Sequence, residues 1–126
     1  LLIHPSTLII VVFSQSFKYT TLMEDNQDKL AAEEARNHAF EELSLALSRA
    51  ADPQLIREFL ACLLTPKELQ EVSSRWALVR EIDSGTTQRE IARKLGLSLC
   101  KITRGSRELK KVDSPFKRMI DLSTKK

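Results

Sequence analysis

The sequence predicts an all-α fold of about six helices. Apolar residues recur at helical spacing through most of the chain, as in the row Phe40, Leu43 and Leu47. A capping residue directly precedes proline at positions 52–53, 65–66 and 114–115, and proline at the first helical position is typical of a helix start. Outside residues 1–22, no segment shows the two-residue alternation with β-branched residues that indicates a strand. These three features together favour a fold built from helices alone.

The first 22 residues differ from the rest of the sequence. They begin with Leu and contain a continuous apolar run at 8–13, which is too short to span a bilayer. They lack a clear basic start and a clear small-residue cleavage site, the marks of a signal peptide. Met23, followed by Glu24 and Asp25, looks like a start of translation. We expect residues 1–22 to be a disordered leader or an over-extended reading frame, with a targeting role as the alternative, and residues 23–126 to form a single domain.

The helices of this domain are placed by their ends and their apolar faces. The first spans about residues 28–50, and the second opens at Asp52, which precedes a proline. The third opens with a capping box, in which Thr65 and Glu68 each bond the other's backbone, and it ends at 84–85. Trp76 shares the apolar face of this third helix, which predicts a core position. A last short helix opens at Ser114, again before a proline.

Residues 87–110 predict two short helices joined by a tight turn. The start signals are a capping box at Thr87 and Glu90 and an N-cap at Ser98. Gly96 stands where the chain must turn sharply, and Ile102 is placed to pack the second helix back onto the first. This spacing is typical of a helix-turn-helix, which places its second helix in the major groove of DNA.

Charge is unevenly distributed along the chain. The whole sequence has 20 Lys and Arg against 17 Asp and Glu, a net charge of +3. Residues 65–126 carry 15 basic and 8 acidic side chains, whereas residues 23–64 carry 4 and 9. Because eight basic residues fall within 88–111, the charge coincides with the turn motif and predicts salt-dependent binding of double-stranded DNA. An ordinary solvated helix face is the alternative.

Several classes of protein are disfavoured. We find no paired carboxylates in a polar loop and no nucleophile beside a base, and three glycines cannot build a phosphate-cradling loop. Cys62 and Cys100 have no CxxC spacing, which favours reduced cytosolic thiols over a disulfide or a zinc site. We therefore expect a cytoplasmic protein that is not an enzyme, binds no membrane and needs no metal or cofactor. Because short helices bury little area alone, oligomerisation is expected.

Four stretches resemble the bacterial tryptophan repressor family: Leu64-Thr65-Pro66, Arg75, Gln88-Arg89-Glu90 and Ile102-Thr103-Arg104-Gly105-Ser106. The resemblance covers about residues 29–122. It implies an intertwined all-helical homodimer that binds operator DNA of tryptophan biosynthesis or uptake genes when L-tryptophan is bound. A related helix-turn-helix regulator that responds to a different ligand, or to none, is the alternative.

The resemblance also implies a site for L-tryptophan between the dimer body and each DNA-reading helix pair. Arg75 and Arg104 would stack on the two faces of the indole, with Arg75 near the carboxylate, and Gly105 would leave room for the ligand. The ammonium would be received by backbone carbonyls of Cys62 and Leu64 together with Thr65. Glu108 departs from the small or hydroxylated residue of better-known members. A carboxylate there either pairs with the ligand ammonium or repels an anionic group nearby.

For DNA, the resemblance assigns roles to both motif helices. Arg89 is similar to the residue that reads a guanine through O6 and N7. The other expected contacts are made to phosphates or the groove by Gln88, Lys101, Thr103, Arg104, Arg107 and Lys110, with Leu99 and Cys100 facing the groove.

Overall fold

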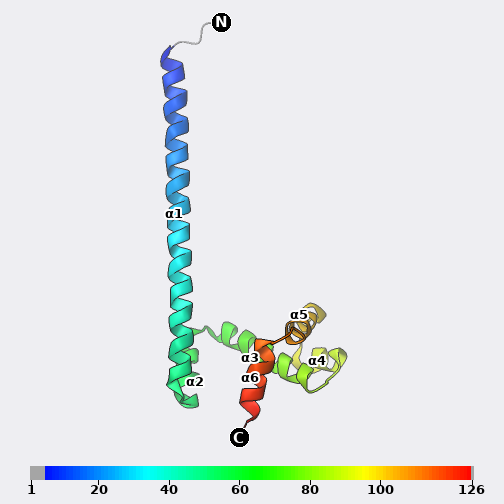
Figure 1. Ribbon diagram of the computed structural model, residues 1–126. Helices are drawn as coiled ribbons and strands as arrows, with labels where there is room; N and C mark the ends of the chain where they lie inside the picture. Colours follow the sequence, from blue (N-terminus) through cyan, green and yellow to red (C-terminus); the bar gives the residue numbers. More distant parts are fainter. Residues whose placement is uncertain (1–4, 126) are drawn as a thin grey trace. The chain divides into compact units, whose positions relative to one another are not determined.

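A computed structural model describes residues 5–125 of the chain, where all regular structure is α-helical (Figure 1). The helices are α1 (Pro5–Ala50), α2 (Pro53–Leu63), α3 (Pro66–Asp83), α4 (Gln88–Leu95), α5 (Leu99–Leu109) and α6 (Pro115–Thr124). No strand occurs within residues 5–125. The all-α class with about six helices is therefore confirmed. The five helices after residue 52 begin where their capping residues predict.

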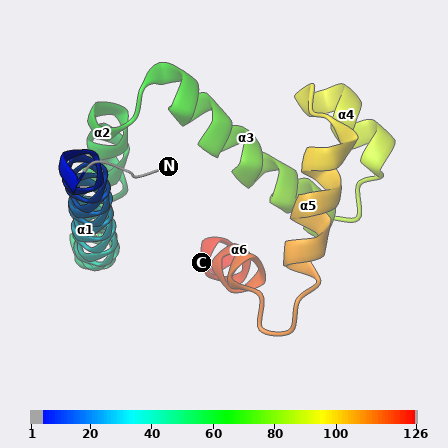
Figure 2. The same cartoon turned by 90° about the horizontal axis from the view of Figure 1, so that it is seen from above.

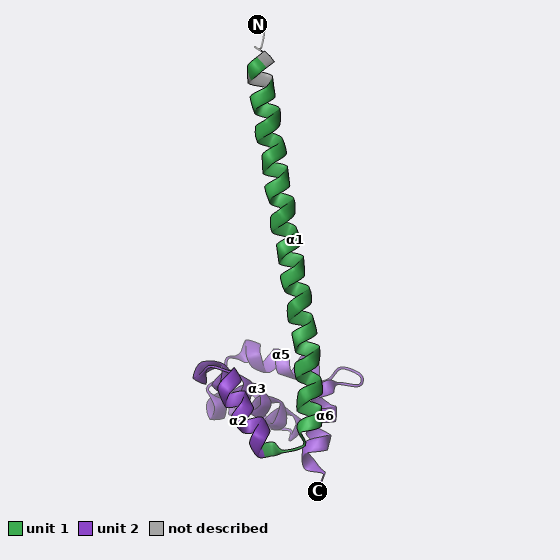
Figure 3. Ribbon diagram, turned by 90° about the vertical axis from the view of Figure 1, so that its left-hand side faces the viewer, with its two compact units in different colours: residues 1–53 green, residues 54–126 purple. Residues whose placement is uncertain are grey.

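The chain divides into two compact units, residues 1–53 and residues 54–126 (Figure 3). The first consists of α1, and the second contains α2 to α6. Within the second unit, α3 to α6 pack on one another, and among its described residues α2 has no packing contact with those four helices. We call residues 66–125, which comprise α3 to α6, the head. None of the described helices combines the length and apolar character needed to cross a bilayer.

Helix α1 extends well beyond the helix expected at residues 28–50. Residues 1–4 of the expected leader lie outside the described residues, but the leader is helical from Pro5 onward, so the structure differs from the disorder that we expected there. The physical reason is that residues 6–50 contain neither Gly nor Pro, so nothing interrupts the backbone hydrogen bonds. All side chains of residues 9–42 are exposed. The domain boundary at residue 23 remains a prediction.

The core of the head is formed by one residue from each of three helices. Leu78 of α3, Ile91 of α4 and Ile102 of α5 are buried against one another. Partly buried apolar side chains surround them, namely Ile82, Ala92, Leu95 and Leu97. Figure 2 shows α4 and α5 gathered at the C-terminal end of α3. The predicted packing of Ile102 back onto the first motif helix is present.

Helix α6 returns to α3 and fixes the C-terminal end of the head. Its Ile120 is buried. Lys117 Nζ lies 3.0 Å from Asp83 Oδ1 at the end of α3, and this hydrogen bond, with that to Asp121, raises the pKa of Lys117. Arg80 donates a hydrogen bond to Ser123 Oγ at 3.2 Å. One ion pair and one hydrogen bond therefore join α6 to α3, and Ile120 is buried at the same end of the head.

The buried face of α3 differs from the predicted one. Trp76, expected in the core, has 37% of its surface exposed, and Val72 is also exposed. The buried residues of α3 are Leu78 and Val79. The reason is that α4, α5 and α6 pack on the side of α3 that carries Leu78 and Val79, so Val72 and Trp76 lack a cover within the single chain.

Candidate functional site

The first motif helix, α4, begins with the predicted capping box. Thr87 Oγ1 accepts a hydrogen bond from the Glu90 backbone N–H at 3.3 Å, and Glu90 Oε2 accepts one from the Thr87 backbone N–H at 3.2 Å. The Thr87 hydroxyl also donates to Glu90 Oε2 at 2.7 Å. The hydroxyl and backbone hydrogen bonds lower the pKa of Glu90. The carboxylate is thus held ionised where free backbone N–H groups favour negative charge.

The turn between α4 and α5 depends on a left-handed glycine. Gly96 caps the C-terminus of α4 with φ 61° and ψ 30°, a conformation that side chains rarely adopt. Ser98 then accepts a hydrogen bond from the Lys101 backbone N–H at 3.5 Å and begins α5. Both signals were predicted from the sequence, and together they set the short reversal that joins the two helices.

A third contact, which the sequence analysis missed, holds α4 on α3. Glu81 of α3 forms an ion pair with Lys94 of α4 and accepts a hydrogen bond from Thr86 Oγ1 at 2.8 Å. The hydrogen bond from Lys94 is the main cause that lowers the pKa of Glu81. Glu81 and Lys94 are 13 residues apart, so no local pattern signals the pair. It therefore occupies one cation of the basic segment.

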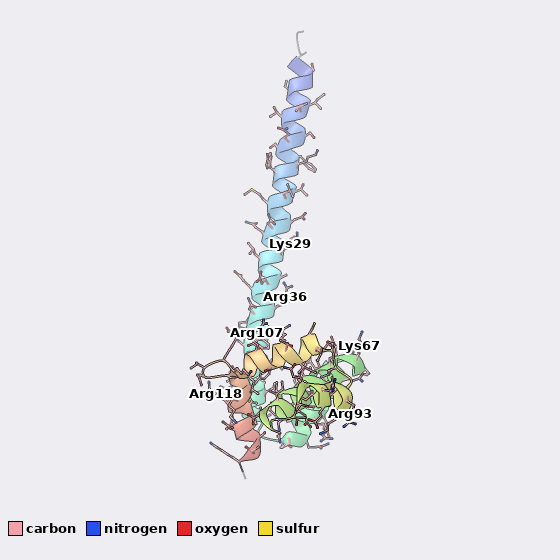
Figure 4. All side chains as sticks on the ribbon, turned by 90° about the vertical axis from the view of Figure 1, so that its right-hand side faces the viewer. Lys29, Arg36, Lys67, Arg93, Arg107 and Arg118 are labelled. Atoms are coloured by element: carbon pink, nitrogen blue, oxygen red, sulfur yellow. The ribbon has the colours of Figure 1, made fainter. Side chains whose placement is uncertain are left out.

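All nine expected DNA-contacting residues are exposed. They are Gln88, Arg89, Leu99, Cys100, Lys101, Thr103, Arg104, Arg107 and Lys110. Arg93 and Arg107, on α4 and α5, are labelled in Figure 4. Because Ile102 and Gly105 form the buried side of α5, the cationic residues share its remaining surface. The second motif helix therefore has one face in the core and one that is basic and accessible.

A cavity of about 660 Å³ lies beside α5, on the side of α3. The residues that line this cavity include Glu71, Arg75, Leu78, Val79, Lys101, Arg104, Gly105, Glu108, Ser114 and Phe116. Four of the seven expected ligand residues therefore come together in one cavity. The other three, Cys62, Leu64 and Thr65, do not line it within this chain.

The cavity combines apolar walls with opposite charges. Leu78 and Val79 contribute apolar surface from α3, while Arg75 and Arg104 contribute guanidinium groups from two different helices. Arg75 lies 4.0 Å from Glu71, and both side chains are largely exposed. Such a cavity suits a molecule that has an apolar body and a carboxylate, since planar guanidinium groups bind carboxylates and stack on rings.

Gly105 has a structural role besides lining the cavity. A Cβ atom at this position would lie 3.1 Å from Leu78 Cδ2 and 3.5 Å from Ile82 Cδ1. The glycine therefore permits the close approach of α5 to α3. The resemblance implies that Gly105 leaves room for the ligand, whereas the structure shows that it leaves room for α3.

Ser114 begins α6 as predicted, yet it does not cap it through its side chain. The residue is 3% exposed, and its hydroxyl has no hydrogen-bond partner in the structure.

Among residues 5–125, no cluster of three or more His, Cys, Asp or Glu side chains could hold a metal ion. Cys62 and Cys100 are both free thiols.

Comparison with known proteins identifies the family. Residues 38–123 match the family described as Trp repressor protein. A Trp operon repressor homolog from Chlamydia caviae is 34% identical over 90 residues, which cover 71% of this chain and 89% of that protein. Homologs of the same name from Chlamydia trachomatis serovar D and Xylella fastidiosa strain M23 are each 36% identical, over 74 and 76 residues. These two alignments cover 58% and 60% of this chain and 79% and 83% of the relatives.

No solved structure matches the chain. The family match spans α3 to α6 almost completely, and so includes both motif helices and the cavity. The family consists of transcription regulators that bind DNA and are not enzymes, which agrees with the absence of catalytic patterns in the sequence. The chain belongs to the Trp repressor family.

Proposed function

We propose that the chain is a tryptophan-dependent repressor, which binds operator DNA of tryptophan genes as a homodimer when L-tryptophan occupies the cavity. The observation that carries this proposal is the double position of Arg104. Its side chain is exposed on the basic surface of α5, and it also lines the cavity. A ligand that contacts Arg104 therefore acts directly on the helix that reads DNA.

The chemistry of the cavity supports an aromatic amino acid as the ligand. The carboxylate of L-tryptophan would pair with Arg75 or Arg104, whose planar groups also stack on an indole. Leu78 and Val79 offer apolar surface to the ring. The cavity therefore offers the apolar surface and the charged groups that bind a flat apolar molecule with a charged end.

The remaining three expected ligand residues support a site shared between two copies. Cys62, Leu64 and Thr65 lie at the end of α2 and before α3, outside the cavity of their own chain. In the proposed dimer the partner's copies of these residues complete the site and receive the ligand ammonium. Carbonyls at a helix end suit this role because the last turn leaves them without partners inside the helix.

The apolar face of α2 supports the same dimer. Leu55, Phe59 and Leu63 recur at helical spacing, yet they are 53%, 39% and 50% exposed, and no residue of α2 is buried. An exposed apolar stripe of this kind is typical of an interface. A second copy, with the same stripe, would cover it symmetrically.

On DNA, α5 would enter the major groove and the N-terminus of α4 would contact its edge. Arg89 would read a guanine, while Gln88, Lys101, Thr103, Arg104, Arg107 and Lys110 would contact phosphates or the groove. Leu99 and Cys100 would face base edges near the start of α5. The alternative is a regulator of the same family that responds to another ligand or to none.

The test is a gel-shift titration of the full chain against a two-fold symmetric trp-type operator, at fixed salt, with and without L-tryptophan. Tight binding only in the presence of L-tryptophan is expected. Equal binding in both conditions would contradict the tryptophan switch and leave the DNA-binding assignment in place.

Two variants separate the roles of the arginines. Arg104→Leu is expected to weaken both L-tryptophan and operator binding, because the residue faces both. Arg89→Ala is expected to reduce operator binding by about 10- to 100-fold, with a smaller loss on random DNA, because a bidentate base contact contributes specificity. Equal losses on both DNAs would reduce Arg89 to a phosphate contact.

A further inference from the structure

We propose that Glu108 recognises the ammonium group of the ligand and makes the cavity selective for zwitterionic amino acids over acids that lack an amine. The inference rests on the proposed function, because it concerns the same cavity and ligand class. It assigns to this side chain a role that backbone carbonyls alone cannot perform, namely the contribution of a full negative charge.

The first step is the placement of Glu108 beside a cation on the same helix. Arg104 and Glu108 are four residues apart on α5, and both line the cavity. Side chains at this spacing lie one above the other on one helix face, about 6 Å apart along the axis. The α5 wall of the cavity therefore presents a guanidinium and a carboxylate as neighbours.

The second step is that Glu108 stays ionised. Lys111 Nζ lies 2.7 Å from Glu108 Oε2, and the side chain of Glu108 is 40% exposed. The hydrogen bond from Lys111, together with the charges of Lys111, Arg104 and Arg107, lowers the pKa of Glu108. At neutral pH the wall thus carries a fixed negative charge next to the positive charge of Arg104.

The third step matches this wall to a ligand. An α-amino acid has its carboxylate and ammonium on adjacent atoms, so it needs a cation and an anion side by side. An indole acid without the ammonium would place its carboxylate near Glu108 without a positive charge of its own to offset the repulsion. Glu108 therefore favours the zwitterion and disfavours the simple acid.

Lys111 gives the inference a second prediction. Its ammonium already pairs with one oxygen of the Glu108 carboxylate, so it competes with the ligand ammonium for that carboxylate. Removing Lys111 should strengthen the contact with the ligand ammonium. If Glu108 served only as a surface partner of Lys111, the same change would leave ligand choice unaltered.

The experiment measures dissociation constants of the full chain by calorimetry for L-tryptophan and for indole-3-propionate, which lacks the ammonium. Wild-type protein should prefer L-tryptophan. Glu108→Gln should reduce that preference about tenfold or more, as expected for loss of a charged hydrogen bond. Lys111→Met should increase it. The preference is the ratio of two dissociation constants measured on the same variant. A partial loss of folded protein would change both constants equally and leave their ratio unchanged.

Asp113→Asn is the comparison variant, since Asp113 is an exposed carboxylate of the head that pairs with Arg118 and does not line the cavity. It should leave the preference within about twofold, because it removes the same charge as Glu108→Gln from a position outside the cavity. An unchanged ratio in Glu108→Gln, or an equal change in Asp113→Asn, would overturn the inference alone. Absence of L-tryptophan binding by wild-type protein would overturn the proposed ligand as well.

Discussion

The head and α2 have similar apolar residues but opposite burial. In the head, Ile91 and Ile102 have no exposed surface. In α2, the regularly spaced Leu55 and Phe59 are at least one third exposed, and none of the helix is buried. The difference shows that apolar spacing identifies a helix face without showing what covers it.

The cause of the difference is that the helices of the head pack on one another, whereas α2 does not pack on them. The helices that bury Ile91 and Ile102 all lie between residues 66 and 125 and are joined by short turns, so the head closes its own core. Helix α2 has no packing contact with the head within its unit. We interpret the head as a self-sufficient reading module, and the apolar stripe of α2 as the surface that the proposed dimer covers.

The largest expected effect is on the core of the head. Ile102→Ala should destabilise the protein by about 2–5 kcal/mol, because it leaves a cavity in a fully buried cluster. Leu99→Ala, on the same helix at 61% exposure, should change stability by less than about 0.5 kcal/mol. Urea unfolding followed by circular dichroism measures both. Similar losses in the two variants would contradict the closed core.

The next effect tests the other side of the comparison. Phe59→Ala should raise the dissociation constant of the proposed dimer about tenfold, because an aromatic side chain at an interface contributes more than average. Phe17→Ala, which removes an equally large side chain from the expected leader, should have no effect. Sedimentation over a range of protein concentrations measures the constant. A monomer at all concentrations, or equal effects of both variants, would contradict the role of α2.

Local signals in the sequence predicted the frame of the head. The capping boxes at Thr65 and Thr87 and the left-handed turn at Gly96 are present because each depends on residues within four positions. The helix starts at residues 66, 88 and 99 follow the same rule, and those at 53 and 115 are marked by a proline in the sequence. Such features are predictable because their hydrogen bonds join residues that are close together in the sequence.

Non-local features were not predictable. Whether Leu78 or Trp76 is buried depends on where α5 meets α3, and that contact joins segments more than twenty residues apart. The Glu81–Lys94 pair has the same origin. The grouping of Arg75, Arg104 and Glu108 followed from the resemblance and not from periodicity, since Arg75 alone would pass for an ordinary solvent-exposed residue.

A smaller effect compares the two capping boxes of the head. Thr87→Ala should cost about 1 kcal/mol, because it removes the acceptor for the Glu90 N–H and the donor to its carboxylate. Thr65→Ala removes the same bonds from α3, which has 18 residues against eight in α4. Hydrogen exchange should show local opening of α4 in the first variant and little local opening of α3 in the second. Equal local opening would show that helix length gives no protection.

The smallest expected effect is a pH dependence that resides in the head. The hydrogen bonds from Thr87 lower the pKa of Glu90 below its ordinary value of 4.5, so the folded state binds a proton less readily than the unfolded chain. The stabilisation is therefore complete above pH 4.5 and is lost as the pH falls through the lowered pKa. Glu90→Gln should unfold at a lower temperature than wild type at neutral pH, and this difference should shrink under acid conditions. Glu33→Gln removes the same charge from exposed α1 and should show no such convergence. Parallel curves for wild type and Glu90→Gln across the acid range would show that the cap does not depend on the charge of Glu90.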